Sequence, residues 1–269
     1  MSTQPPHLGR VLIIAGSDSG GGAGVQADIK TVTALGGYAA TAVTAITVQN
    51  SLGVFGVHPI PAPVVEAQGR AVIDDIGADA IKTGMLGDAP TVEAAARLID
   101  HAGVPAVIDP VMVATSGDAL AGPDVAAAMI RLLIPRAALL TPNAPEAAAF
   151  TGLVVETADD LRRAGEALLR LGAGAVLMKG GHIAGYTVTD LLITPAGETT
   201  FAGPRIQTRH THGTGCTLAS ACAAGLAQGL SLEQAVARAW AYVAEAIRRA
   251  PGFGAGAGPL DHGWMLRGG

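Results

Sequence analysis

The chain has 269 residues, of which 49% are hydrophobic, 14% charged and 3% aromatic, and its formal net charge is −5. This apolar composition excludes a disordered chain, and 37 glycines without a three-residue period exclude collagen. With no basic run and few rings for base stacking, we expect no nucleic-acid partner.

The distribution of charge and cysteine bears on the compartment. Residues 31–65 lack charged side chains, but glycines, prolines, Gln49 and Asn50 interrupt them, so we expect no membrane-spanning helix. Residues 1–10 have no apolar run typical of a secretory signal. Cys216 and Cys222 are too few for a disulfide framework. We therefore expect a cytoplasmic protein that does not bind membranes.

Apolar runs and helical patterns alternate along the chain. In order, we predict a strand at 11–15, a helix at 23–35, strands at 41–48 and 54–57, a helix at 63–76, a strand at 79–83, a helix at 91–102, a strand at 106–109, a helix at 124–133, a strand at 138–141, a helix at 158–171, a strand at 175–179, a hairpin of 190–194 with 198–202, and helices at 213–228 and 232–249.

This alternation predicts the fold class. Strands that are apolar throughout and separated by helices form a mainly parallel sheet with helices on both faces, an α/β fold. We expect a flexible extension at 1–10 and a single domain at 11–269, with a glycine-rich tail from about 251. In such sheets ligands bind beyond the carboxyl ends of the strands, which is where the polar and glycine clusters of this sequence fall.

Two common phosphate-binding motifs are absent. No Gly-Lys dipeptide occurs, which excludes a P-loop, and the glycine run at 20–24 does not fit GxGxxG. The strongest local signal is instead the segment His-Gly-Thr-Gly-Cys-Thr at 212–217, which opens a predicted helix. Its glycines let backbone N–H groups turn toward an anion, and the helix N-terminus adds partial positive charge. The alternative is an ordinary helix start beside an inert cysteine, which is how we interpret Cys222.

The Gly-Thr-Gly-Cys segment resembles the Gly-x-Gly-Asp signature of the ribokinase-like kinases, with cysteine in place of the usual aspartate. That replacement is typical of the hydroxymethylpyrimidine/phosphomethylpyrimidine kinase branch. Other segments are similar to that branch in the same order: 14–30 (IAGSDSGGGAGVQADIK), 82–86 (KTGML), 109–112 (DPVM), 116–118 (SGD), 141–146 (TPNAPE), 178–182 (MKGGH) and 256–259 (GAGP). The resemblance covers roughly residues 11–262 and implies a three-layer α/β/α sandwich.

The resemblance implies the catalytic roles. Cys216 would take the proton from the substrate alcohol. The backbone N–H groups of Gly213, Thr214, Gly215 and Cys216 would hold the charge that develops on the transferring phosphoryl group.

A second set of residues would bind ATP and Mg2+. Asn143 and Glu146 are three residues apart on a turn after a strand, and they could face one magnesium ion; an Asx turn with a solvated helix residue is the alternative. Asp109 would share that ion or steady the alcohol. Lys179 and Thr211 would contact phosphate.

The remaining site residues would bind the pyrimidine. The resemblance makes Asp28 a contact to the ring or its hydroxymethyl group. Gln49 carries a donor and an acceptor that match an aminopyrimidine edge, and Met85 offers an apolar surface to the ring. Gly16, Ala23 and Val111 would leave the ring close to the backbone. Without the resemblance, each of these would be interpreted as a core or turn residue.

We therefore expect an ATP- and magnesium-dependent kinase of the hydroxymethylpyrimidine and its monophosphate, acting in thiamine synthesis. A pyridoxine/pyridoxal kinase of the same fold is the nearest alternative, and Gln49 favours the pyrimidine. A non-catalytic vitamin- or nucleotide-binding regulator is the alternative from another class. We also expect a homodimer, with the strand at 54–57 as a dimer contact or a lid. His210 and His212, without a third ligand, are a weak candidate for a metal pair.

Overall fold

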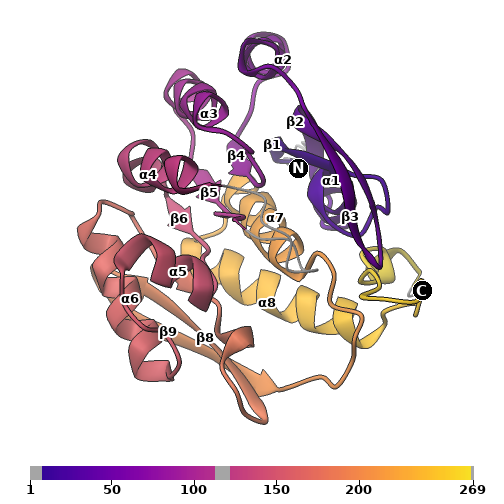
Figure 1. The fold of residues 1–269 in the computed structure, drawn as a ribbon, viewed down its shortest axis with the longest axis vertical. Helices are drawn as coiled ribbons and strands as arrows, with labels where there is room; N and C mark the ends of the chain where they lie inside the picture. Colours follow the sequence, from indigo (N-terminus) through magenta and orange to yellow (C-terminus); the bar gives the residue numbers. More distant parts are fainter. Residues whose placement is uncertain (1–7, 113–121, 268–269) are drawn as a thin grey trace, which may run out of the picture.

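A single nine-stranded sheet runs through the computed structural model, which describes residues 8–112 and 122–267 (Figure 1). Its strand order is β3-β2-β1-β4-β5-β6-β7-β8-β9. The strands are β1 (Arg10–Asp18), β2 (Tyr38–Asn50), β3 (Gly53–Pro59), β4 (Ala80–Thr83), β5 (Ala106–Ile108), β6 (Leu139–Leu140), β7 (Val176–Met178), β8 (Thr187–Thr194) and β9 (Gly197–Pro204). The strands from β2 to β7 are parallel, while β3, β8 and β9 add antiparallel pairs at the two edges.

Helices cover both faces of this sheet. The α-helices are α1 (Gly24–Ala34), α2 (Ala62–Asp75), α3 (Ala89–Ala102), α4 (Pro123–Leu132), α5 (Ala144–Thr151), α6 (Ala158–Arg170), α7 (Thr214–Ala227) and α8 (Leu232–Arg248). Short 3-10 turns lie at Ile134–Arg136, Gly180–His182 and Trp264–Arg267. Helices α2 to α6 pack on one face and α1, α7 and α8 on the other, which confirms the predicted sandwich.

The side chains of β1 alternate between the two faces of the sheet, which shows why a layer of helices covers each face. Leu12 and Ile14 are buried in the core under α2 to α6, and Val11 and Ile13 in the core under α1, α7 and α8. Successive side chains of a strand point to opposite faces, so an apolar strand needs helices on both sides. Because the strands from β2 to β7 are parallel, their carboxyl ends lie at one edge of the sheet, where the loops that follow them meet.

The predicted strands and helices are all present, with shifted ends. Strand β1 runs on to Asp18, and β2 starts at Tyr38 rather than at 41. Helix α5 was not predicted, because its eight residues are nearly all apolar and carry little amphipathic pattern. None of the helices in the described ranges is long and apolar enough to cross a membrane.

Candidate active site

Three polar side chains follow the ends of neighbouring strands. Asp109 comes directly after β5, Asn143 lies shortly after β6, and Lys179 comes directly after β7. The Lys179 N–H donates to the carbonyl of Pro142 at 2.9 Å, and Asn143 forms a parallel bridge with Lys179. The parallel order β5-β6-β7 thus brings residues that are distant in sequence to one place.

Lys179 forms the centre of a charged cluster there. Its Nζ lies 3.0 Å from Asp109 Oδ1 and 3.9 Å from Glu146 Oε2. The Thr141 hydroxyl donates to Asp109 Oδ1 at 3.3 Å. Burial opposes the charge of Lys179, but the two carboxylates outweigh that effect and raise its pKa, so it is an ammonium at neutral pH.

Asn143 and Glu146 form a capping box at the start of α5. The Glu146 N–H donates to Asn143 Oδ1 at 2.9 Å, and the Asn143 N–H donates to Glu146 Oε2 at 2.8 Å. Burial raises the pKa of Glu146 to about 7, Lys179 opposes that shift and Asp109 adds to it. The box holds the carboxylate beside the cluster rather than in solvent, so the solvated alternative does not apply.

The N-terminus of α7 faces the same cluster. A Cβ placed on Gly215 would lie 3.2 Å from Lys179 Nζ and 3.8 Å from Asp109 Oδ2. Gly213 has φ +84°, and a Cβ on it would lie 1.8 Å from the carbonyl oxygen of Gly22, so no other residue fits there. By helix geometry, the N–H groups of Gly215 and Cys216 have no acceptor within α7. Together they form a cradle for an anion.

Cys216 lies in the first turn of α7 and is partly buried. Burial raises the pKa of its thiol to about 11; Lys82 opposes this shift, while Asp28 and Asp109 add to it. The sulfur is therefore a neutral thiol at pH 7 in this state. Cys222, six residues further along the helix, is fully buried in the core, as expected from the sequence.

A buried ion pair lies beneath this helix. Lys82 Nζ is 2.9 Å from Asp28 Oδ1 and 2.8 Å from Oδ2, and the Ser220 hydroxyl donates to Oδ1 at 2.7 Å. Burial opposes the charge on Lys82, but the negative groups around it prevail and raise its pKa. Asp28 has no exposed surface, so a contact with the pyrimidine would require this group to rearrange.

The predicted apolar contacts of the ring lie beside β1. A Cβ on Gly16 would lie 2.4 Å from the terminal methyl group of Met85, which shows that the two residues touch. The Thr44 hydroxyl fixes the Met85 carbonyl at 2.7 Å. Ala23 and Val111 are partly exposed, on the glycine loop and just beyond Asp109. Residues 116–118 of the family-like segments lie outside the described residues.

Gln49 and Thr211 lie near the same helix terminus but differ in their contacts. Gln49 is partly exposed at the end of β2, and its side-chain amide lies 3.0 Å from His212 Nε2. Thr211 accepts the N–H of Thr214 with its carbonyl at 3.2 Å. His212 also contacts Asp18 Oδ2 at 3.0 Å. No cluster of three metal-ligating side chains occurs among the described residues, so the histidines do not form part of one.

The C-terminal tail supports this helix terminus from the other side. His262 is buried, its Nε2 lies 3.0 Å from the Thr217 hydroxyl of α7, and its carbonyl accepts from the Tyr242 hydroxyl at 2.5 Å. Burial lowers the pKa of His262 to about 4, and Lys30 contributes in the same direction. The folded protein therefore contains a neutral histidine.

This histidine makes the stability depend on pH. Below about pH 6.5 His262 binds a proton in the unfolded chain, whereas in the folded chain it stays neutral until about pH 4. The free energy of unfolding therefore decreases as the pH is lowered through that window. We expect His262 to lower the free energy of unfolding by about 2 kcal/mol between pH 7.5 and pH 5. Urea unfolding of the wild type and of His262→Gln at both pH values measures this loss. An equal pH dependence in the two proteins would contradict it.

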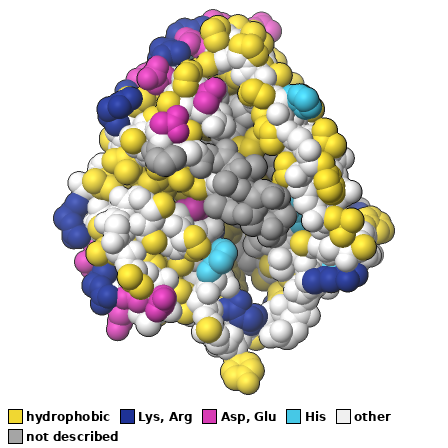
Figure 2. Space-filling view, viewed as in Figure 1, with side chains coloured by type: hydrophobic (Ala, Val, Ile, Leu, Met, Phe, Trp, Pro, Cys, Tyr) yellow, Lys and Arg dark blue, Asp and Glu magenta, His cyan; other side chains and the backbone are white. Residues whose placement is uncertain are grey.

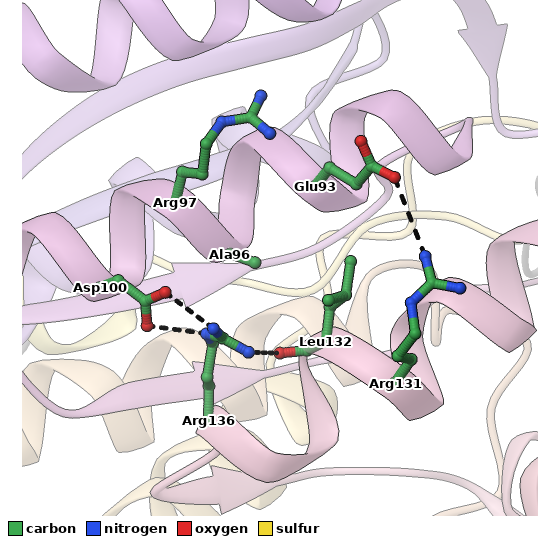
Figure 3. A pocket seen from close by; sticks show the side chains of 7 residues that line it. All are labelled: Glu93, Ala96, Arg97, Asp100, Arg131, Leu132 and Arg136. Carbon is green, nitrogen blue, oxygen red and sulfur yellow. Dashed lines mark hydrogen bonds and ion pairs between the residues drawn. The ribbon is translucent and has the colours of Figure 1, made fainter.

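A recess lies between α3 and α4 (Figure 3). It has a volume of about 190 Å³, and its charged lining residues are paired. Arg136 binds Asp100 at 2.7 Å, Arg131 lies 3.8 Å from Glu93, and Arg97 binds Glu66 at 2.8 Å. It lies on the outer side of the helices and contains none of the predicted site residues, so we do not place the site there.

The sequence left several site residues unassigned. Asp18 was given no role from the sequence, yet it caps the glycine loop by accepting N–H groups of Gly20, Gly22 and Ala23 at 2.8–3.0 Å. Thr141 and Ser220 were not singled out at all. For each of these three residues, the signal in the sequence was a polar side chain within or beside an otherwise apolar strand or helix.

Known proteins match this chain along nearly all of its length. The family model described as phosphomethylpyrimidine kinase matches residues 18–261. A hydroxymethylpyrimidine/phosphomethylpyrimidine kinase of Streptomyces coelicolor is 50% identical over 264 residues, which cover 98% of each chain.

Solved structures agree in fold. The pyridoxal kinase of Staphylococcus aureus in complex with AMP-PCP and pyridoxal superimposes with a TM-score of 0.90 at 36% identity, covering 97% of this chain and 95% of that chain. The phosphomethylpyrimidine kinase of Clostridium difficile 630 superimposes with a TM-score of 0.79 at 39% identity, covering 88% of this chain and 99% of that chain.

Proposed function

The chain belongs to the phosphomethylpyrimidine kinase family and is an ATP-dependent kinase of hydroxymethylpyrimidine and its monophosphate in thiamine biosynthesis, and we propose how its residues perform both transfers. The observation that carries the proposal is the cradle of α7 facing Lys179 and Asp109. Phosphoryl transfer needs charge neutralisation and alignment more than covalent chemistry, and this arrangement supplies both.

Lys179 and the cradle bind the nucleotide in this proposal. The Lys179 ammonium is held in place by Asp109, and it lies close to Gly215 at the start of α7. The N–H groups of Gly215 and Cys216 meet the γ-phosphoryl group as its negative charge moves toward the bridging oxygen. The N–H of Thr214 is already donated to the carbonyl of Thr211, so it takes no part in the cradle. Thr211, at the edge of the cradle, contacts a further phosphate oxygen.

Asp109 and Glu146 fit a magnesium ion. Asp109 Oδ2 is buried and has no hydrogen-bond partner among the described residues, although a buried carboxylate oxygen normally has one. Hard oxygen ligands from one or two carboxylates are what Mg2+ prefers, with water completing its shell. Asp109 would hold the ion directly and Glu146 through water, with Asn143 keeping Glu146 in place. When bound, the ion neutralises phosphate charge.

In its thiolate form, Cys216 accepts the proton of the substrate hydroxyl in the first transfer. The ring lies against Met85 and the bare backbone at Gly16, Ala23 and Val111. Gln49 pairs with its aminopyrimidine edge. In the second transfer the nucleophile is a phosphate oxygen that carries no proton to be removed near neutral pH, so the cradle and Lys179 suffice.

A pyridoxal kinase is the second candidate, because solved pyridoxal kinases share the fold with a TM-score of 0.90. Gln49 distinguishes the two, since its amide matches an aminopyrimidine edge better than the phenolate edge of pyridoxal. We expect the wild type to favour the hydroxymethylpyrimidine when both compounds compete at equal concentration. We expect Gln49→Leu to lose about tenfold or more in kcat/KM for the pyrimidine. A higher kcat/KM for pyridoxal in the wild type would overturn the preference.

We also propose that the β2 and β3 hairpin forms a homodimer contact. Ile46, Val48, Leu52, Phe55 and Val57 are exposed there, and Figure 2 shows hydrophobic side chains gathered over this edge. An edge strand with exposed apolar side chains is a ready surface for a second copy.

Charge on this hairpin should separate the protomers. Ile46 and Val48 are two residues apart on β2 and therefore point to the same face of the sheet. We expect light scattering to give a dimer mass for the wild type and a monomer mass for Ile46→Lys with Val48→Lys. Tyr186→Lys, at a residue that is 93% exposed and distant in sequence, should remain a dimer. A monomeric wild type would contradict the proposal.

A further inference from the structure

His212 connects three segments that are far apart in the sequence. Its Nε2 lies 3.0 Å from Asp18 Oδ2 and 3.0 Å from the amide nitrogen Nε2 of Gln49. Its backbone N–H donates to the carbonyl of Gly258 at 3.1 Å. A Cβ on Gly22 would lie 2.5 Å from the ring, so the ring has little room to turn.

Asp18 determines which atom of His212 carries a proton. Its carboxylate accepts three backbone N–H groups, from Gly20, Gly22 and Ala23. Burial opposes its charge, but the bonds from His212 and the backbone lower its pKa, so Asp18 is ionised at neutral pH. An ionised carboxylate can only accept, so His212 Nε2 must carry a hydrogen and donate it. As placed, the amide nitrogen of Gln49 meets this donor, so we turn the amide by about 180° to bring its oxygen against His212 Nε2. The single hydrogen of Nε2 is then shared between Asp18 Oδ2 and the Gln49 oxygen.

Thr47 leads to the same orientation from the other end of the amide. Its hydroxyl donates its single hydrogen to the carbonyl of Ser17 at 2.7 Å. As placed, the amide oxygen Oε1 of Gln49 lies 3.3 Å from that hydroxyl oxygen, which has only acceptor capacity left once its hydrogen is donated to Ser17. The NH2 group of Gln49 must therefore face Thr47. Two independent contacts thus select one of the two orientations of this amide.

A fixed amide presents its donor and its acceptor in a fixed order. With one bond to His212 and one to Thr47, Gln49 retains one N–H and one oxygen lone pair for a ligand. A cavity of about 190 Å³ opens beside Gln49 and His212, lined otherwise by residues 50–53 and 256–257 and by none of the other residues proposed to contact the ring. In a 4-aminopyrimidine the amino donor and the ring-nitrogen acceptor are adjacent, and only one order of partners fits once the hydroxymethyl group points to Cys216.

We propose that His212 is a positioning residue for substrate specificity, which acts by holding the Gln49 amide in the orientation that recognises the aminopyrimidine edge. This inference rests on the proposed role of Gln49. It assigns His212 no contact with the substrate and no metal. Its position directly before Gly213 also means that an effect on the anion cradle has to be told apart from an effect on Gln49.

Two substitutions of His212 separate the donor from the bulk of the ring. Glutamine places an amide nitrogen close to where Nε2 lies, whereas leucine fills the space without a donor. We expect His212→Leu to raise KM for the hydroxymethylpyrimidine about 10- to 100-fold, with a smaller change in kcat and an unchanged KM for ATP. His212→Gln should restore most of the loss. His210→Gln, two residues earlier and outside the site, should resemble the wild type.

A double-mutant cycle with Gln49→Leu tests whether His212 acts through Gln49. In the Gln49→Leu background, His212→Leu should change KM for the pyrimidine by less than about twofold. A full additional loss in that background, or a raised KM for ATP, would show that His212 acts on the cradle and would overturn the inference. If Gln49→Leu alone leaves KM unchanged while the pyrimidine is still phosphorylated, the role of Gln49 is wrong and the inference falls with it.

Thr47→Val provides a test that leaves His212 untouched. It removes the second restraint on the amide, and valine matches threonine in shape. We expect KM for the pyrimidine to rise about three- to tenfold, with no change in KM for ATP. An unchanged KM for the pyrimidine would contradict a fixed amide even if the His212 variants fail to fold.

Discussion

Replacing Cys216 with alanine should reduce kcat/KM for the hydroxymethylpyrimidine by about 100-fold or more, because a positioned general base contributes about 10²- to 10⁴-fold. The same variant should phosphorylate the monophosphate at a rate within about threefold of the wild type, since that nucleophile needs no base. Initial rates with each substrate at saturating ATP measure the two effects. A single side chain should therefore separate two reactions that share one site.

Cys222→Ala is the matched control for this prediction. It removes a thiol from the same helix, but Cys222 is fully buried in the core and is not one of the proposed site residues. We expect both rates to stay within about threefold of the wild type. Equal losses of both activities in Cys216→Ala would show that Cys216 supports the cradle rather than removing a proton. Equal activity of Cys216→Ala and wild type on the alcohol would exclude the base role.

The pH dependence of the first transfer follows from the thiol. Because burial raises the pKa of Cys216 to about 11, the thiolate fraction grows roughly tenfold per pH unit through the neutral range. If the thiolate is the active form, kcat/KM for the alcohol rises with that slope between about pH 6.5 and pH 9.5. The second transfer should be flat above about pH 7, where the monophosphate is fully ionised.

The sequence pattern was sufficient for all the strands and for every α-helix except α5, and it predicted the edge of the sheet at which the candidate site lies. Apolar runs with helical segments between them can form few structures other than a covered parallel sheet, and such a sheet places its strand ends together. Asp109 and Lys179 were selected because each follows a strand. The structure brings them within 3.0 Å of each other and next to Gly215.

Contacts that depend on strand order and on the path of the tail could not be predicted in this way. Lys82 and Asp28 meet only because β4 lies beside β1, and nothing in either local sequence marks the pairing. His212 and Asp18 are 194 residues apart and meet where α7 begins against the glycine loop. Spacing in one sequence does not report such distances, so the contacts from which the orientation of Gln49 is inferred emerged only from the structure.

Gly213→Ala should abolish most of both transfers, unlike Cys216→Ala. A Cβ at this position would lie 1.8 Å from the carbonyl oxygen of Gly22, so the backbone that forms the cradle would have to move. Loss of one such donor group lowers kcat by about 10²- to 10³-fold, and the cradle serves both nucleophiles alike. We expect both kcat values to fall by at least about 100-fold, measured with each substrate at saturating ATP.

Gly229→Ala is the control for Gly213→Ala. It places alanine in the same left-handed backbone conformation without displacing the neighbouring backbone. Gly229 has φ +82°, close to the +84° of Gly213, but its Cβ would meet nothing within 4 Å. The left-handed conformation costs an L-residue about 1–2 kcal/mol in either place, so Gly229→Ala should lose that much stability in urea unfolding and Gly213→Ala more, because its methyl group also meets the Gly22 carbonyl. Only Gly213→Ala should also lose activity, because only there does the new methyl group displace the N–H groups that face the phosphoryl charge. If Gly213→Ala kept the second transfer while it lost the first, the cradle would serve the alcohol alone, and the common site proposed for both reactions would be wrong.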